Sequence, residues 1–197
     1  MRGTAMKRLP LLALVSTLLT TGPLAAPAQA PATASTLAPR LGEVEKKFIK
    51  DFVEQHLVEQ DLVGRARSKE QAAVRDTKPT PLSPAVSGLQ KKMFNELTAS
   101  WTELATVSQA KKVEIPTAAK PKDLTDSAAV AKLPPDKFDK EFLKVLAKEA
   151  KKTDLILTTA AKSVRDAELK AFVDKWAPTF KAHLAEIETA EKTLKGK

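Results

Sequence analysis

Beyond residue 40, apolar side chains recur at steps of three and four residues, which is the spacing of one face of an α-helix. The pattern predicts four long helices, at about residues 42–75, 84–113, 135–163 and 166–194. The last is the most regular, with apolar positions at Leu169, Phe172, Val173, Trp176, Phe180, Leu184, Ile187 and Leu194. Four amphipathic helices joined by short segments pack most simply as an antiparallel four-helix bundle, so we expect an all-α fold.

Proline and capping residues support these boundaries. Ser83 and Pro84 supply a capping side chain followed by a proline at the first helical position. Residues 117–133 are expected to form a linker with a short helical turn at about 124–130. Pro178 is the exception, because it lies inside the fourth helix and should kink it or remove one hydrogen bond.

Residues 1–30 have the pattern of a secretory signal peptide. Basic residues are followed by an apolar run, Leu9–Leu19, which is too short to span a bilayer, and by a small-residue cleavage site at Ala26-Pro27-Ala28 or Ala28-Gln29-Ala30. The alternative is an uncleaved N-terminal anchor. Residues 31–41 are rich in Ala, Pro, Ser and Thr and are expected to be a disordered leader. The mature chain, the helical domain 42–197, is therefore expected in the periplasm or at the outer membrane, with no transmembrane segment.

The amino-acid composition limits the kinds of site that the chain can form. The absence of cysteine excludes disulfides, thiolate catalysis and cysteine metal sites. The formal charge is +9, and removing the three basic residues of the signal leaves about +6. Such a charge favours contact with an anionic envelope surface, although solubility alone also explains it. We find no phosphate-binding loop, nucleophile elbow or zinc-protease motif, so the sequence does not indicate an enzyme.

The chain has two histidines, and each is followed three residues later by a glutamate. His56 precedes Glu59 in the first helix, and His183 precedes Glu186 in the fourth. Such pairs lie on one helix face, and the first and fourth helices of a bundle are often neighbours. One hypothesis is therefore a divalent metal site formed by these four residues. The alternative is a partly buried imidazole with solvated glutamates, and no cofactor.

Lysines form a basic stripe along the third helix, at Lys137, Lys140, Lys144, Lys148 and Lys151. This stripe is suited to an anionic envelope surface, an acidic polymer or a protein partner, or it is simply a solvated face. The aromatic residues, including Trp101 and Trp176, fall on the apolar stripes instead of between the lysines. Because single-stranded nucleic acid binding needs exposed stacking platforms, we expect no nucleic acid partner.

Several stretches resemble a bacterial family, domain of unknown function 4142. They are Leu57-Val58-Glu59, Lys91-Lys92-Met93, Lys111–Pro116, Phe138–Phe142 and Ala177–Leu184. Members are exported, often labelled putative outer membrane proteins, and look like ferritin-like four-helix bundles. The resemblance therefore implies that fold and an exported location.

The chain also departs from the family pattern. Members commonly carry Asp-His in the second and third helices, where this chain has Glu96-Leu97 and Glu149-Ala150. His183 remains, and His56 matches no family position. We therefore expect a non-enzymatic, envelope- or stress-associated binding or structural protein. The alternative is a ferritin-like metal-binding or oxidation-linked protein whose site is degenerate.

Overall fold

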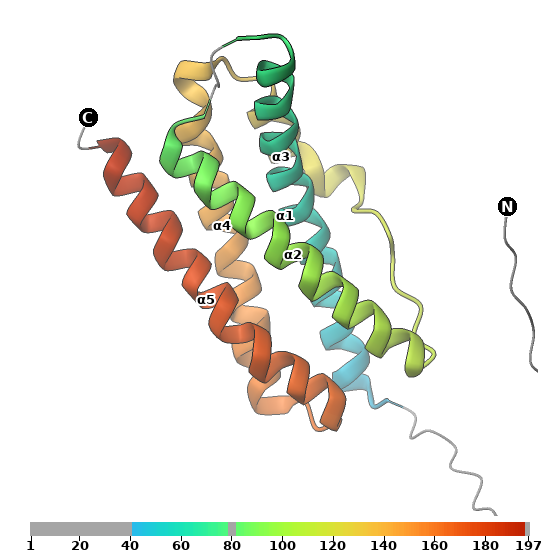
Figure 1. Cartoon of the computed structure of the whole chain (residues 1–197). Helices are drawn as coiled ribbons and strands as arrows, with labels where there is room; N and C mark the ends of the chain where they lie inside the picture. The colour runs from blue at the N-terminus through green and yellow to red at the C-terminus, as the bar shows by residue number, and fades with distance from the viewer. Residues whose placement is uncertain (1–40, 79–81, 196–197) are drawn as a thin grey trace, which may run out of the picture. The chain divides into compact units, whose positions relative to one another are not determined.

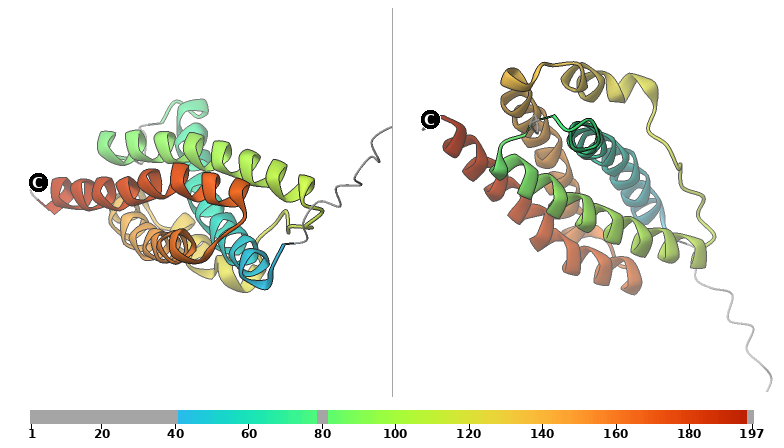
Figure 2. Two further views of the ribbon diagram at one scale, coloured as in Figure 1. Left: turned by 90° about the horizontal axis from the view of Figure 1, so that it is seen from below. Right: turned by 45° about the horizontal axis from the view of Figure 1, so that its top comes forward.

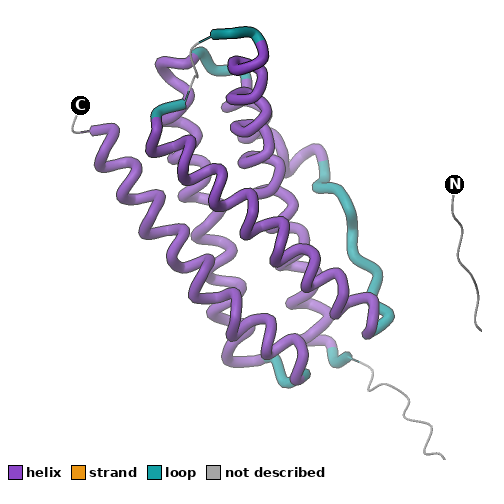
Figure 3. Tube along the Cα trace, viewed as in Figure 1, coloured by secondary structure: helices purple, strands orange, loops and turns teal. Residues whose placement is uncertain are grey.

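The structure, a computed structural model, describes residues 41–78 and 82–195, and the expected signal peptide lies outside them. Every regular element among the described residues is a helix, and none is a strand (Figure 3). The helices are α1 (Glu43–Arg75), α2 (Pro84–Ala110), a 3₁₀ turn η1 (Pro121–Leu124), α3 (Thr125–Ala131), α4 (Pro135–Ser163) and α5 (Ala167–Lys195). The all-helical prediction is confirmed. No helix in the described part of the chain combines the length and the apolar character that crossing a membrane requires.

The four long helices surround one hydrophobic core (Figure 1). α1 packs mainly against α2 and α4, and α5 packs mainly against the same two helices. The first and last helices are therefore not the adjacent pair that the metal hypothesis assumes. They meet instead through aromatic side chains in the core, where Phe52 lies 5.4 Å from Phe172 and 5.6 Å from Phe180 between ring centroids. Trp176 and Phe180 are both buried, as the α5 stripe predicts.

Side-chain contacts fix the register between these helices. Along α2, Lys92 pairs with Glu186 and Lys111 pairs with Asp166, so residue numbers rise along α2 as they fall along α5. Between α1 and α4, Thr153 bonds to Glu59, while Glu45 accepts a hydrogen bond from the backbone nitrogen of Arg165 just beyond α4. These contacts lie at different heights of the helices, so they fix how far each helix is shifted along its neighbour.

The helix ends follow from local chemistry. Ser83 accepts a hydrogen bond from the Val86 nitrogen at 3.4 Å, and Asp166 accepts one from the Leu169 nitrogen at 3.1 Å. α2 stops at Ala110, three residues before the expected end at 113, because Lys112 adopts a φ of 57° and the Val113 nitrogen closes back onto the Ser108 carbonyl. α5 remains helical through Pro178.

The first turn of α1 does not follow a simple rule of apolar inside and polar outside. The apolar Val44 is exposed, whereas Glu45 is buried. The Glu45 carboxylate is held there because it accepts the hydrogen bond from the Arg165 nitrogen at 2.9 Å. Leu41, which the sequence places in the disordered leader, is buried in the core.

Residues 111–134 connect α2 to α4 and form the crossover segment. It runs along the side of α1 away from α5, and it carries η1 and α3 (Figure 2). α3 contacts both α1 and α4. Part of its attachment is polar: Lys120 pairs with Glu54 at 2.6 Å, Asp126 pairs with Lys148 at 2.7 Å, and Ser127 bonds to Asp61. The other part is apolar, because Val130 is buried in the core and three partly buried side chains pack against it, Val113, Ile115 and Ala119.

Candidate functional site

The basic stripe of α4 lies on its outer face. All five lysines of the stripe are exposed. Lys144 pairs with Glu141 at 3.2 Å, and Lys148 pairs with Asp126 at 2.7 Å. Lys137, Lys140 and Lys151 form no ion pair with any residue between 41 and 195 that the structure describes. Three uncompensated charges therefore lie along about 21 Å of helix, at 1.5 Å rise per residue.

A second group of polar residues lies inside the core, at mid-height of the helices. We call it the central polar layer and define it as His56, Glu59, Glu96, Glu149, Thr153 and His183. Five of these side chains belong to buried residues, and Glu96 is part-exposed. Buried polar groups usually have hydrogen-bond partners, so each one in this layer needs an explanation.

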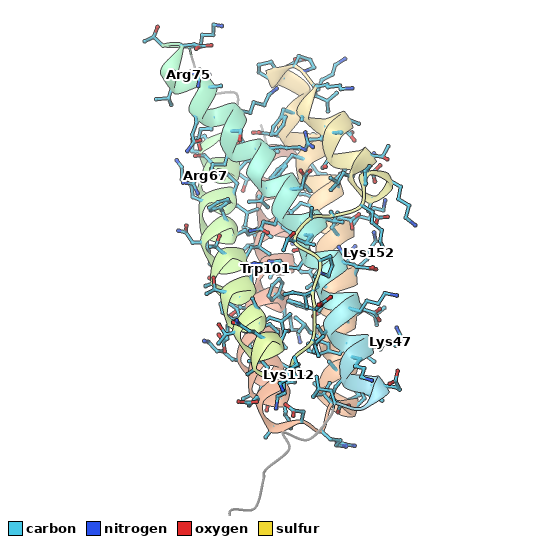
Figure 4. The ribbon with its side chains drawn as sticks, turned by 90° about the vertical axis from the view of Figure 1, so that its right-hand side faces the viewer. Lys47, Arg67, Arg75, Trp101, Lys112 and Lys152 are labelled. Atoms are coloured by element: carbon cyan, nitrogen blue, oxygen red, sulfur yellow. The ribbon has the colours of Figure 1, made fainter. Side chains whose placement is uncertain are left out.

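His56 is enclosed by aromatic rings. Its imidazole stacks on Phe52 at 5.5 Å and on Trp101 at 5.7 Å between ring centroids. Neither ring nitrogen makes a hydrogen bond of normal geometry with a described residue. Burial lowers the pKa of His56 to about 4, with a small opposing effect from the Leu97 carbonyl, so the ring is neutral at pH 7. Trp101, labelled in Figure 4, thus contributes to packing around this histidine.

Glu59 lies between α1 and α4. Thr153 donates a hydrogen bond to Glu59 Oε1, whereas Oε2 has no partner among the described residues. Burial raises the pKa of Glu59 to about 7; the Thr153 hydrogen bond opposes this shift, and the nearby Glu149 carboxylate adds to it. Glu149 itself accepts hydrogen bonds from Gln55 at 2.9 Å and Lys152 at 2.7 Å.

His183 and Glu186 point to different partners on α2. His183 Nε2 lies 2.6 Å from Glu96 Oε2, and Nδ1 has no partner in the described part of the chain. Burial lowers the pKa of His183, although the hydrogen bond to Glu96 opposes this effect. Glu186 is part-exposed and forms an ion pair with Lys92.

The structure therefore separates the four residues of the metal hypothesis. His56 lies among aromatic rings, Glu59 bonds to α4, and Glu186 pairs with a lysine at the surface. Within residues 41–78 and 82–195, no three His, Cys, Asp or Glu side chains converge as metal ligands would. A metal site needs several donors at fixed geometry, and this donor set does not fit one.

Some residues of the central polar layer are accessible to sequence reasoning and others are not. The family resemblance points to Glu96 and Glu149, since they replace the usual Asp-His pairs. Nothing in the sequence points to Thr153, because a threonine on an amphipathic helix fits the core or the surface equally well. Its role depends on the lateral placement of α4 against α1, which local patterns do not specify.

These features define an all-helical protein with a basic outer face on α4 and a polar layer in its core. The family model described as Domain of unknown function (DUF4142) matches residues 26–190, and the chain belongs to this family. The resemblance inferred from the sequence is thereby confirmed. Neither the search of curated proteins nor the search of solved structures found a match.

Proposed function

We propose that the chain is an exported, non-enzymatic protein that folds as an antiparallel, ferritin-like four-helix bundle and binds an anionic surface of the cell envelope. The observation that carries the proposal is the basic stripe of α4, in which Lys137, Lys140 and Lys151 lack acidic partners among the described residues. Each lysine near an anionic membrane contributes about 1 kcal/mol of attraction.

The ferritin-like arrangement rests on the connections between helices. The α1–α2 and α4–α5 connections are short, whereas α2 and α4 are joined by the long crossover segment. One long crossover in an otherwise short-looped bundle is the topology of ferritin-like folds. This arrangement leaves the outer face of α4 open to a flat partner.

Vesicle co-sedimentation tests the binding proposal. The wild-type chain should bind phosphatidylglycerol vesicles and not neutral phosphatidylcholine vesicles, and binding should weaken as salt rises. The double variant Lys140→Glu with Lys151→Glu should bind at least about thirtyfold more weakly. Lys181→Glu with Lys192→Glu, at exposed positions on α5, is the matched control because it makes the same change in net charge.

Two outcomes would overturn the proposal. Equal weakening in both double variants would mean that net charge, and not the α4 stripe, determines binding. If the wild-type chain did not bind phosphatidylglycerol vesicles, the proposal that it binds an anionic envelope surface would be wrong. Export is tested separately by cell fractionation: recovery of the full-length chain in the cytoplasm would contradict it.

The ferritin-like metal alternative has one supporting observation. Buried polar atoms of His56, Glu59 and His183 have no partners in the described part of the chain, and unpaired groups of this kind sometimes mark a ligand. Because the donors do not converge in the described part of the chain, envelope binding is the function that the structure supports better.

A further inference from the structure

A polar cavity of about 580 Å³ lies between α1, α4 and the crossover segment. We call it the crossover groove. Its inner wall includes Glu149, whose side chain is 4% exposed, and Gln55, which donates a hydrogen bond to Glu149. Figure 4 shows the crossover segment passing over α1, with Lys152 labelled beside it. The groove therefore joins the surface to the edge of the central polar layer.

The groove carries both signs of charge. Lys122 and Asp123, neighbours in η1, line it and form no ion pair with a described residue. Lys148 lines it from α4 and is paired there with Asp126 at 2.7 Å. Unpaired positive and negative groups in one cavity are suited to a ligand that is itself zwitterionic, because each ligand charge then meets an opposite one.

The outer edge of the groove is apolar. Leu155 lines the groove and is 67% exposed, one of three exposed large hydrophobic side chains among the described residues. It follows Lys151, the last lysine of the basic stripe, by one helical turn. Val58 and Ile156 extend this apolar edge inward. A lysine face that ends in an exposed leucine resembles the way interfacial helices contact lipid, with charges at the headgroups and apolar side chains below them.

We propose that the crossover groove binds a zwitterionic phospholipid headgroup of the phosphoethanolamine type. Lys122 would hold the phosphate, with Lys148 turning to it from its ion pair with Asp126. Asp123 and Glu149 would accept hydrogen bonds from the ammonium group, while Leu155 enters the apolar layer. The inference rests on the proposed function, since it names the lipid that the envelope-binding face selects. A quaternary choline group has no N–H donor, so the carboxylates should discriminate against it.

The test keeps the anionic lipid constant and changes the zwitterionic one. Vesicles contain a fixed fraction of phosphatidylglycerol, with the remainder either phosphatidylethanolamine or phosphatidylcholine. We expect about tenfold tighter binding to the phosphatidylethanolamine vesicles, the effect of one charge-assisted hydrogen bond. Asp123→Asn should remove this preference and leave the phosphatidylglycerol-dependent binding. Because Asp123 is exposed, this variant is expected to fold, and Glu149→Gln provides a second, buried test.

Leu155→Ser should weaken binding to both kinds of vesicle. Val74→Ser is the matched control, because Val74 is 69% exposed near the end of α1 and does not line the groove. Soluble phosphoethanolamine separates the sources of the headgroup: competition would show that the headgroup alone is recognised, and a lipid preference without competition would show that the membrane surface is required.

The outcomes separate the two proposals. Equal binding to phosphatidylethanolamine and phosphatidylcholine vesicles would overturn this inference and leave the lysine-dependent function intact. A preference that survives Asp123→Asn and Glu149→Gln would also overturn it, because lipid packing and not the groove would then be its cause. Loss of binding to all phosphatidylglycerol vesicles would instead overturn the proposed function.

Discussion

Glu59 and Thr153 are joined by a hydrogen bond across the interface between α1 and α4, and both residues are completely buried. The second carboxyl oxygen of Glu59 has no partner among the described residues. An ionised carboxylate in this position would lack most of the compensation that a buried charge requires. The interface is therefore built for the neutral acid.

This geometry predicts a stability change with pH. Burial raises the pKa of Glu59 from 4.5 to about 7, so its contribution to stability is complete below pH 4.5 and is lost as pH rises toward 7. Glu59→Gln keeps the shape and removes the ionisation. Relative to wild type, this variant should gain about 3 kcal/mol of unfolding free energy between pH 4.5 and pH 8.

Urea unfolding at several pH values measures this difference. The control is Glu188→Gln at an exposed position of α5. Its unfolding free energy, plotted against pH, should run parallel to that of wild type. A Glu59→Gln curve that is also parallel to wild type would show that the carboxyl is ionised and solvated in the folded protein.

The contribution of His56 to stability should change with pH in the opposite direction from that of Glu59, over nearly the same pH range. Burial lowers its pKa from 6.5 to about 4, so its contribution is complete above pH 6.5 and is lost as pH falls toward 4. His56→Phe removes this loss, and the variant should therefore resist acidification better than wild type, by about 3 kcal/mol at pH 4 relative to pH 7. Unfolding monitored by tryptophan fluorescence provides the measurement.

Phe52→Leu is the matched control for His56→Phe, because it alters the same aromatic cluster and adds no titrating group. Identical pH curves for these two variants would contradict the assignment of His56. In wild type, Glu59 and His56 largely cancel between pH 4.5 and 6.5, since one loses stability with rising pH and the other gains it. Only the single variants reveal each dependence.

The sequence identifies the helices better than it identifies their neighbours. Phe172, Val173 and Trp176 are buried as expected, because helical periodicity is a local property of the chain. Glu45 shows the limit: it takes the buried position beside the exposed Val44 because the Arg165 nitrogen, 120 residues away, donates a hydrogen bond to it. No local pattern contains that contact.

In the candidate sites, too, features set by local periodicity could be predicted, and features set by contacts between distant residues could not. The exposure of Lys140 and Lys151 could be predicted, since both lie opposite the apolar face of their helix. The separation of His56, Glu59, His183 and Glu186 could not, because it depends on α1 packing against α2 and α4 and on Lys92 pairing with Glu186. The crossover groove likewise requires knowledge of where residues 121–131 lie.

α1 and α2 are each followed by a non-glycine residue whose backbone lies in the left-handed helical region, Thr77 after α1 and Lys112 after α2. Thr77 has a φ of 54°, and the Lys78 nitrogen bonds to the Ala73 carbonyl at 2.9 Å in the usual helix-ending pattern. A β-branched residue is strained there, so Thr77→Gly should raise the free energy of unfolding by about 1 kcal/mol. Thermal unfolding measures the change.

The control for Thr77→Gly is the same substitution within a helix. Thr106→Gly, at an exposed position of α2, should lower the free energy of unfolding by about 1 kcal/mol, because glycine is unfavourable in a helix interior. A loss of stability in Thr77→Gly would show that the Thr77 hydroxyl bond to the Asp76 carbonyl outweighs the backbone strain.

Metal analysis decides between the two functions. We expect protein purified without a tag to contain no stoichiometric iron, zinc or manganese, because His183 is bonded to Glu96 and Glu186 is paired with Lys92. Stoichiometric metal that disappears in His183→Ala and persists in Lys181→Ala, a nearby exposed position, would contradict this prediction. It would establish that the donors rearrange around a metal, and the ferritin-like alternative would then account for the unpaired polar atoms of the central polar layer.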